Sequence, residues 1–226
     1  VNRFFKVIQA ERKILLKAGI GAGFGAAVGA PWAGAIFGIE VVSGGKLRLN
    51  SLFQCVIASF VGYFVTYLLH APHSQYSFSN IPNLNLYTIA LIALAGVIFG
   101  LTARLFIRFT HYYESLMSKN ISYTPLKPFI GGLIIILLFY AEGSLRYAGL
   151  GIPYIQQVFS EISSFKDPAL KLLFTSLTVG SGFKGGEFVP LVFVGTTLGS
   201  AMGLFFPALF QIFAGVGFAS VFAGAS

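Results

Sequence analysis

Residues 180–190 form the stretch of this chain whose residue types could bind an ion. They read Gly-Ser-Gly-Phe-Lys-Gly-Gly-Glu-Phe-Val-Pro and lie between two apolar runs. Glycine permits sharp turns that expose backbone amides, and Pro190 fits the first turn of a following helix. Unpaired amides and the positive end of the dipole let a helix N-terminus bind an anion without a cationic side chain. The stretch therefore predicts an anion site, and a plain turn outside the membrane is the alternative.

Two charged side chains, Lys184 and Glu187, belong to this stretch. A carboxylate beside an anion repels it unless the carboxylate points away, carries a proton or pairs with Lys184. Because carboxylates are also stabilised at helix N-termini, we expect Glu187 to have a structural role.

The histidines offer no alternative chemistry. His70, His73 and His111 lack the spacing of metal ligands. The sequence predicts no metal site, no cofactor and no catalytic residue.

The elements that position the stretch are predicted to be membrane helices. The chain has 226 residues, a mean hydropathy of +0.81 and 10% charged residues, against about 25% in soluble domains. A crossing helix needs roughly 20 apolar residues. The long apolar runs are residues 18–42, 51–69, 87–103 and 188–226. The predicted fold class is an all-α integral membrane protein with several spans.

Some of these helices are predicted to be broken or tilted. Pro31 and Pro207 interrupt two of the long runs, and proline breaks or kinks a helix. The runs at residues 129–141 and 170–180 are too short to cross the membrane alone. We expect them to be half-helices.

The basic residues predict which loops face the cytoplasm. The net charge is +8, but the Lys and Arg residues gather in short segments around Lys46 and in residues 104–127, as in the cytoplasmic loops of membrane proteins. The uncharged loop at residues 72–86 reads as external. Since the basic residues form no stripe, nucleic acid is not predicted as a partner.

Glycines recur every fourth residue in three places. Such faces let helices approach closely in lipid, which predicts tight packing. The three sets are Gly21, Gly25 and Gly29; Gly96 and Gly100; and Gly195, Gly199 and Gly203.

Two motifs resemble those of the CLC family of chloride channels and chloride/proton exchangers. Residues 185–190, Gly-Gly-Glu-Phe-Val-Pro, are similar to the family's Gly-x-Phe-x-Pro element. Residues 29–40, Gly-Ala-Pro-Trp-Ala-Gly-Ala-Ile-Phe-Gly-Ile-Glu, are similar to its Asn-Ala-Pro-Leu-Ala-Gly-x-x-Phe-x-x-Glu segment. Residues 149–153 give a weaker third match. The resemblance identifies residues 1–226 as a partial CLC-like transmembrane domain.

The resemblance implies an anion held in mid-membrane by backbone amides. The amides of Glu187 and Phe188 are the expected ligands, and we add Gly185 and Gly186 as predicted anion-binding residues. It also implies a homodimer in the cell membrane, with the lipid bilayer and an inorganic anion as partners. The family's gating glutamate, serine loop and coordinating tyrosine have no counterpart here. We expect them to lie before Val1 and after Ser226, in parts of a longer protein.

Departures from the family pattern leave alternatives open. Exchangers often carry a second glutamate after the position of Glu40, where this chain has Val41. That favours a channel or a different proton path, with Glu40 either a structural carboxylate or part of a proton path. Residues 183–187, Phe-Lys-Gly-Gly-Glu, look more like the fluoride-exporting branch.

The predicted function is a chloride channel or anion/proton exchanger. The alternatives are a fluoride/proton antiporter of the same fold, an unrelated secondary transporter and a non-transporting membrane scaffold.

Overall fold

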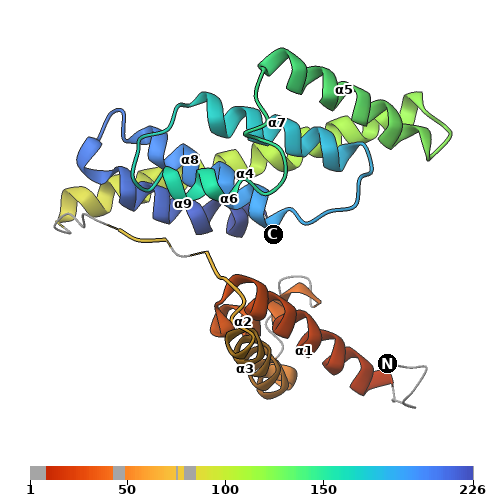
Figure 1. Ribbon diagram of the computed structural model, residues 1–226, viewed down its shortest axis with the longest axis vertical. Helices are drawn as coiled ribbons and strands as arrows, with labels where there is room; N and C mark the ends of the chain where they lie inside the picture. Colours follow the sequence, from red (N-terminus) through yellow and green to blue (C-terminus); the bar gives the residue numbers. More distant parts are fainter. Residues whose placement is uncertain (1–8, 43–48, 75, 79–84, 226) are drawn as a thin grey trace. The chain divides into compact units, whose positions relative to one another are not determined.

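The computed structural model describes residues 9–42, 49–74, 76–78 and 85–225, and every regular element among them is a helix (Figure 1). The chain divides into two compact units, Val1–Gln75 and Tyr76–Ser226. Each unit is built by helices packed on one another, as expected for an all-α protein.

The described residues of the first unit form three α-helices and a short 3-10 turn. They are α1 (Gln9–Val28), α2 (Pro31–Val41), η1 (Leu49–Ser51) and α3 (Leu52–Leu68). The first apolar run is broken as predicted, because α1 ends at Val28 and Pro31 opens α2. Between them Gly29 has a φ of +76°, in the left-handed region that favours glycine.

Glycines let the helices of the first unit approach closely. A Cβ on Gly38 would lie 2.6 Å from the carbonyl oxygen of Lys17, and one on Gly21 would lie 2.8 Å from that of Gly34. Gly25 faces the side chain of Ser59. The predicted packing of Gly21 and Gly25 is therefore confirmed, whereas Gly29 lies beyond the helix and faces His73.

Ser59 joins α3 to the start of α2. Its side chain is fully buried, and its hydroxyl donates to the carbonyl of Pro31 at 2.7 Å. We expect Ser59→Ala to destabilise the protein by about 1 kcal/mol, because the partly buried hydrogen bond between α3 and α2 is lost. The midpoint of thermal unfolding in detergent measures the loss. Thr66→Val is the control on the same helix, since the Thr66 hydroxyl bonds within α3, to Tyr63. Equal midpoints for the two variants would contradict the prediction.

The second unit contains the remaining helices. They are α4 (Leu86–Asn120), α5 (Leu126–Glu142), α6 (Ile152–Gln157), α7 (Lys166–Gly180), α8 (Phe188–Met202), η2 (Pro207–Leu209) and α9 (Phe210–Ala225). The predicted half-helices are α5 and α7, and the run from residue 188 is interrupted before Pro207 as predicted.

The prediction that residues 104–127 form a loop is wrong. Helix α4 continues through this basic segment to Asn120. Its second half keeps one buried face at helical spacing, formed by Phe106, Thr110, Tyr113 and Met117, so packing holds it in a helix despite its charges.

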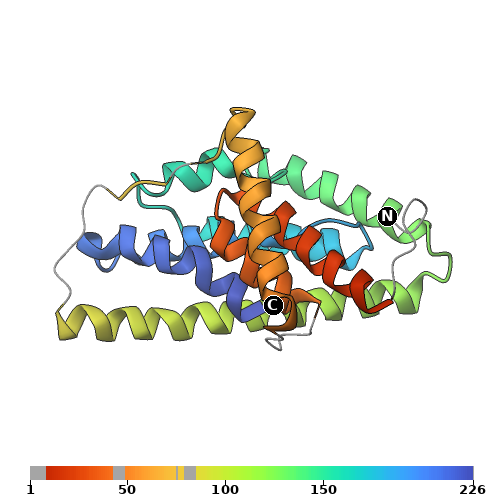
Figure 2. The ribbon, with the colours of Figure 1, turned by 90° about the horizontal axis from the view of Figure 1, so that it is seen from below.

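The core of the second unit lies where α9 packs antiparallel along α8 and where it packs on α4 (Figure 2). A Cβ on Gly195 would overlap the carbonyl oxygen of Gly217, and one on Gly199 would overlap that of Phe213. The predicted glycine face of α8 therefore packs on α9. By contrast, a Cβ on Gly96 or Gly100 would meet nothing within 4 Å. The Cα of Gly100 does lie 3.8 Å from the position of a Cβ on Gly224 of α9, so the packing expected of that pair is found at Gly100 but not at Gly96.

Three helical segments among the described residues are long and apolar enough to cross a membrane: Leu49–Leu68, Leu86–Asn120 and Pro207–Ala225. At 15 residues, α7 and α8 are shorter than a crossing requires. Long spans and short apolar helices are thus combined in one chain.

Candidate functional site

Residues 181–187 form the turn that joins α7 to α8, and its residues 182–186 are exposed. Ser181 closes α7, with its hydroxyl donating to the carbonyl of Leu177 at 2.6 Å. The chain then reverses at Gly182, whose φ is +89°, and the amide of Gly182 bonds the carbonyl of Val179 at 2.9 Å. One glycine of the motif is therefore required by the backbone of this turn.

The turn leads directly into the N-terminus of α8. Glu187 is the N-cap residue, its carbonyl accepts from the amide of Leu191 at 3.0 Å, and Pro190 lies in the first turn. The amides of Gly185, Gly186 and Glu187 make no hydrogen bond to any described residue. Both glycines face open space, since a Cβ on either would meet nothing within 4 Å. The arrangement offers donors at the positive end of a helix dipole.

The carboxylate of Glu187 has no partner among the described residues. Its side chain is partly buried, accepts no capping hydrogen bond and forms no ion pair with Lys184 or any other described residue. Phe188 follows, with its ring against that of Phe222 at a centroid distance of 4.8 Å. Glu187 lies at the helix start, where the dipole stabilises a carboxylate, so its structural role stays a prediction.

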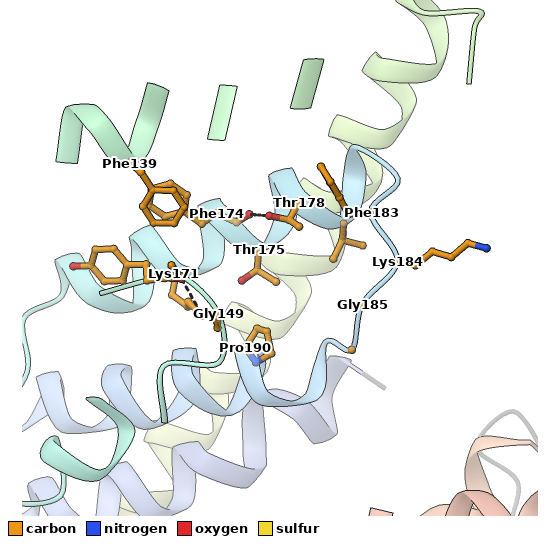
Figure 3. A pocket seen from close by; sticks show the side chains of 14 residues that line it. Phe139, Gly149, Lys171, Phe174, Thr175, Thr178, Phe183, Lys184, Gly185 and Pro190 are labelled. Carbon is orange, nitrogen blue, oxygen red and sulfur yellow. Dashed lines mark hydrogen bonds between the residues drawn. The ribbon is translucent and has the colours of Figure 1, made fainter. Parts of the chain in front are cut away.

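A cavity of about 260 Å³ lies behind the turn, bounded by α5, α7 and the first turn of α8. Its lining includes Gly185, Gly186 and Pro190, but neither Glu187 nor Phe188. Figure 3 shows Lys184 at its edge, with the side chain directed away from the other labelled residues. The structure therefore separates the four predicted anion-binding residues: the two glycines border the cavity, and the two residues at the helix start do not.

Lys171 forms the inner wall of this cavity and was not predicted as a site residue. It is 2% exposed, and its ammonium donates to the carbonyls of Tyr147 at 2.9 Å and Gly149 at 2.7 Å. It also lies 5.0 Å from the ring centre of Phe193. The sequence did contain a signal for Lys171, because a lysine within an apolar run such as residues 170–180 is costly and usually marks a functional or paired site.

The turn at residues 149–153 presents those carbonyls. Gly149 and Gly151 have φ values of +59° and +70°, and a Cβ on Gly151 would come within 2.7 Å of the Phe193 ring. The weak third motif is therefore a backbone turn that brings the Gly149 carbonyl to Lys171.

Asp167 holds the same region from the start of α7. It is 3% exposed and accepts from the hydroxyls of Tyr147 at 2.7 Å and Tyr154 at 2.8 Å. The amide of Ser164 donates to it at 3.0 Å, and Arg146 forms an ion pair with it at 3.5 Å. This buried carboxylate thus fixes the chain on both sides of α6.

Glu40, the other predicted carboxylate, lies in the first unit. It is the last residue but one of α2 and partly buried, and its carboxylate has no hydrogen bond or ion pair with a described residue. The C-terminal end of a helix does not favour a carboxylate. No contact supports a structural role for it.

The part of the chain that the structure describes contains no group of three or more His, Cys, Asp or Glu residues able to hold a metal ion. Cys55 is a free, buried thiol that packs with Ala35 and Ile39.

Comparison with known proteins gives a consistent result. A family model described as voltage gated chloride channel matches residues 1–226. A "Chloride/fluoride channel protein" from Pseudomonas syringae pv. tomato is 40% identical over 232 residues, covering 100% of this chain and 51% of the relative. A "Voltage-gated ClC-type chloride channel ClcB" from Salmonella dublin is 30% identical over 201 residues, covering 85% and 47%.

A solved structure titled as a CLC-type fluoride/proton antiporter superposes with a TM-score of 0.90 at 29% identity. The match covers 99% of this chain and 57% of that one. The chain spans about half the length of the curated relatives it matches.

Proposed function

The chain belongs to the voltage gated chloride channel (CLC) family of membrane proteins, and on that basis we propose that it forms part of a pathway for a small inorganic anion. The observation that carries the proposal is the group of backbone amides at Gly185, Gly186 and Glu187, which make no hydrogen bond to a described residue at the start of an apolar helix. Within the membrane, such donors bind an anion by replacing water molecules of its hydration shell.

The predicted ligands keep their place in this proposal. Gly185, Gly186, Glu187 and Phe188 are the proposed anion-binding residues, with backbone amides as the donors. The ion crosses unchanged, so no catalytic residue and no cofactor is proposed. The proposed setting is the cell membrane, with the protein as a homodimer, as the family resemblance implies.

Chloride transport is the first form of the proposal, and fluoride/proton antiport is the second. Two findings favour the second: the name of the Pseudomonas relative includes fluoride, and the matching solved structure is titled as a fluoride/proton antiporter. Since Val41 follows Glu40, coupling requires another acid. The carboxylate of Glu187, which has no ion-pair partner among the described residues, is the proposed proton acceptor in this form.

Ion flux from liposomes tests the function. The full-length protein is reconstituted into vesicles loaded with either fluoride or chloride, and release is followed with ion-selective electrodes while a dye reports the internal pH. A channel releases anion without a pH change. An antiporter acidifies the vesicle interior as fluoride leaves. Release of neither ion above the rate of protein-free vesicles would refute the proposal.

Glu187→Gln separates the two forms. In an antiporter, we expect this variant to reduce protons moved per fluoride by at least about tenfold, because an amide cannot accept the proton, while fluoride release continues. The internal pH dye and the fluoride electrode give both rates. Glu161→Gln is the control, since the Glu161 carboxylate is exposed and, among the described residues, accepts a hydrogen bond from Gln157 alone. Unchanged coupling in Glu187→Gln would remove Glu187 from the proton path.

A further inference from the structure

The cavity behind the turn has a polar face made by α7. Lys171 and Thr175 are four residues apart on that helix and both line the cavity, as expected for neighbours on one helical face. None of the 14 lining residues carries a carboxylate. The cavity is therefore built to attract negative rather than positive charge.

Thr175 contributes a hydroxyl to the wall of this cavity. The residue is 9% exposed, and it makes no hydrogen bond to any described residue. Figure 3 shows its oxygen directed toward the part of the cavity where Lys171 and Gly149 lie. Thr178, one turn further along, instead donates to the carbonyl of Phe174 at 2.7 Å. Because the oxygen of Thr175 is accessible from the cavity that this residue lines, it is available to donate a hydrogen bond to a ligand there.

Lys171 contributes a buried ammonium to the wall of the same cavity. None of the ion pairs formed by described residues includes it. Its two hydrogen bonds to the carbonyls of Tyr147 and Gly149 use two of the three protons of the ammonium. An uncompensated buried charge is strongly stabilised by a counter-ion.

We propose that this cavity holds a hydrated monovalent inorganic anion, which accepts a hydrogen bond from Thr175 in the field of Lys171. The ion is expected to keep some of its water, because about 260 Å³ is room for several molecules of roughly 30 Å³ each. The inference rests on the proposed function in that the ion is the transported one. The site is separate from the helix start, since Glu187 and Phe188 do not line the cavity.

A pair of isosteric substitutions tests the site. Thr175→Val removes the hydroxyl that faces the cavity, whereas Thr178→Val, the matched control, removes one already bonded within its own helix. We expect Thr175→Val to raise the anion concentration for half-maximal release from liposomes by about tenfold, the value of one hydrogen bond to an ion. Thr178→Val should stay within about twofold of the unmodified protein. Identical behaviour of the two variants would overturn the proposal.

Binding measured without transport separates this proposal from the transport function. Fluoride or chloride is titrated calorimetrically into the purified full-length protein and both variants. Tenfold weaker binding in Thr175→Val alone supports the cavity site, even if the unmodified protein releases no anion from liposomes and the transport function fails. Binding isotherms that coincide for Thr175→Val and Thr178→Val, or no binding to the unmodified protein, overturn the cavity site whatever the flux.

Discussion

Replacing Gly199 with valine is expected to abolish recovery of folded protein. A Cβ at this position would overlap the carbonyl oxygen of Phe213 and lie 2.7 Å from the amide nitrogen of Ala214. These are backbone atoms of a packed helix and cannot move aside as a side chain can, so α8 and α9 must separate. We expect a loss of at least about 3 kcal/mol, a large part of the stability of most proteins. Size-exclusion chromatography of the detergent extract measures the folded fraction.

Gly96→Val is the matched control for that experiment. Gly96 also lies in an apolar helix and has another glycine four residues along, but a Cβ there would meet nothing within 4 Å. The control should elute as the unmodified protein does. A symmetric peak of normal height for Gly199→Val would show that the α8–α9 contact is not what holds the second unit together.

Replacing Asp167 with alanine is expected to cost about 3–5 kcal/mol of folding free energy. The substitution removes the buried acceptor of the Tyr147 and Tyr154 hydroxyls and the counter-charge of Arg146, and buried groups left without partners cost far more than an exposed pair. The turn that presents carbonyls to Lys171 should loosen as a result. Thermal unfolding followed by intrinsic fluorescence gives the change.

Glu161→Ala serves as the reference for Asp167→Ala. Its carboxylate is exposed and accepts only from Gln157 within its own segment, at 2.8 Å. The expected change is within about 0.5 kcal/mol. Comparable melting temperatures for the two variants would show that the Asp167 contacts do not stabilise this region.

The helices and their interruptions could be predicted because proline and glycine act locally. Pro31 and Pro207 begin helical segments where the apolar runs were expected to break, and Pro190 lies in the first turn of α8. The extension of α4 was missed because charge was taken as the sign of a loop. What keeps residues 104–120 helical is the buried face from Phe106 to Met117, which depends on contacts with other helices.

Only the local part of the candidate site could be predicted. The glycine-rich turn and the helix that starts at Phe188 follow from residue types. The cavity, however, depends on Lys171, which meets the carbonyls of Tyr147 and Gly149 across more than 20 residues of sequence. Thr175 could not be distinguished from Thr178 without knowing which hydroxyl bonds its own helix.

The shortness of α7 has an electrical consequence. Its 15 residues span roughly 22 Å, which is less than the hydrocarbon thickness of about 30 Å. A helix of this length that starts at one membrane surface therefore ends within the hydrocarbon core of the bilayer. An ion held at the following turn therefore experiences only a fraction of the applied voltage, out of about 2.3 kcal/mol per charge for each 100 mV. The affinity for the ion should therefore change less with voltage than the rate of its complete transfer does. The ratio of these two voltage dependences measures the electrical depth of the site.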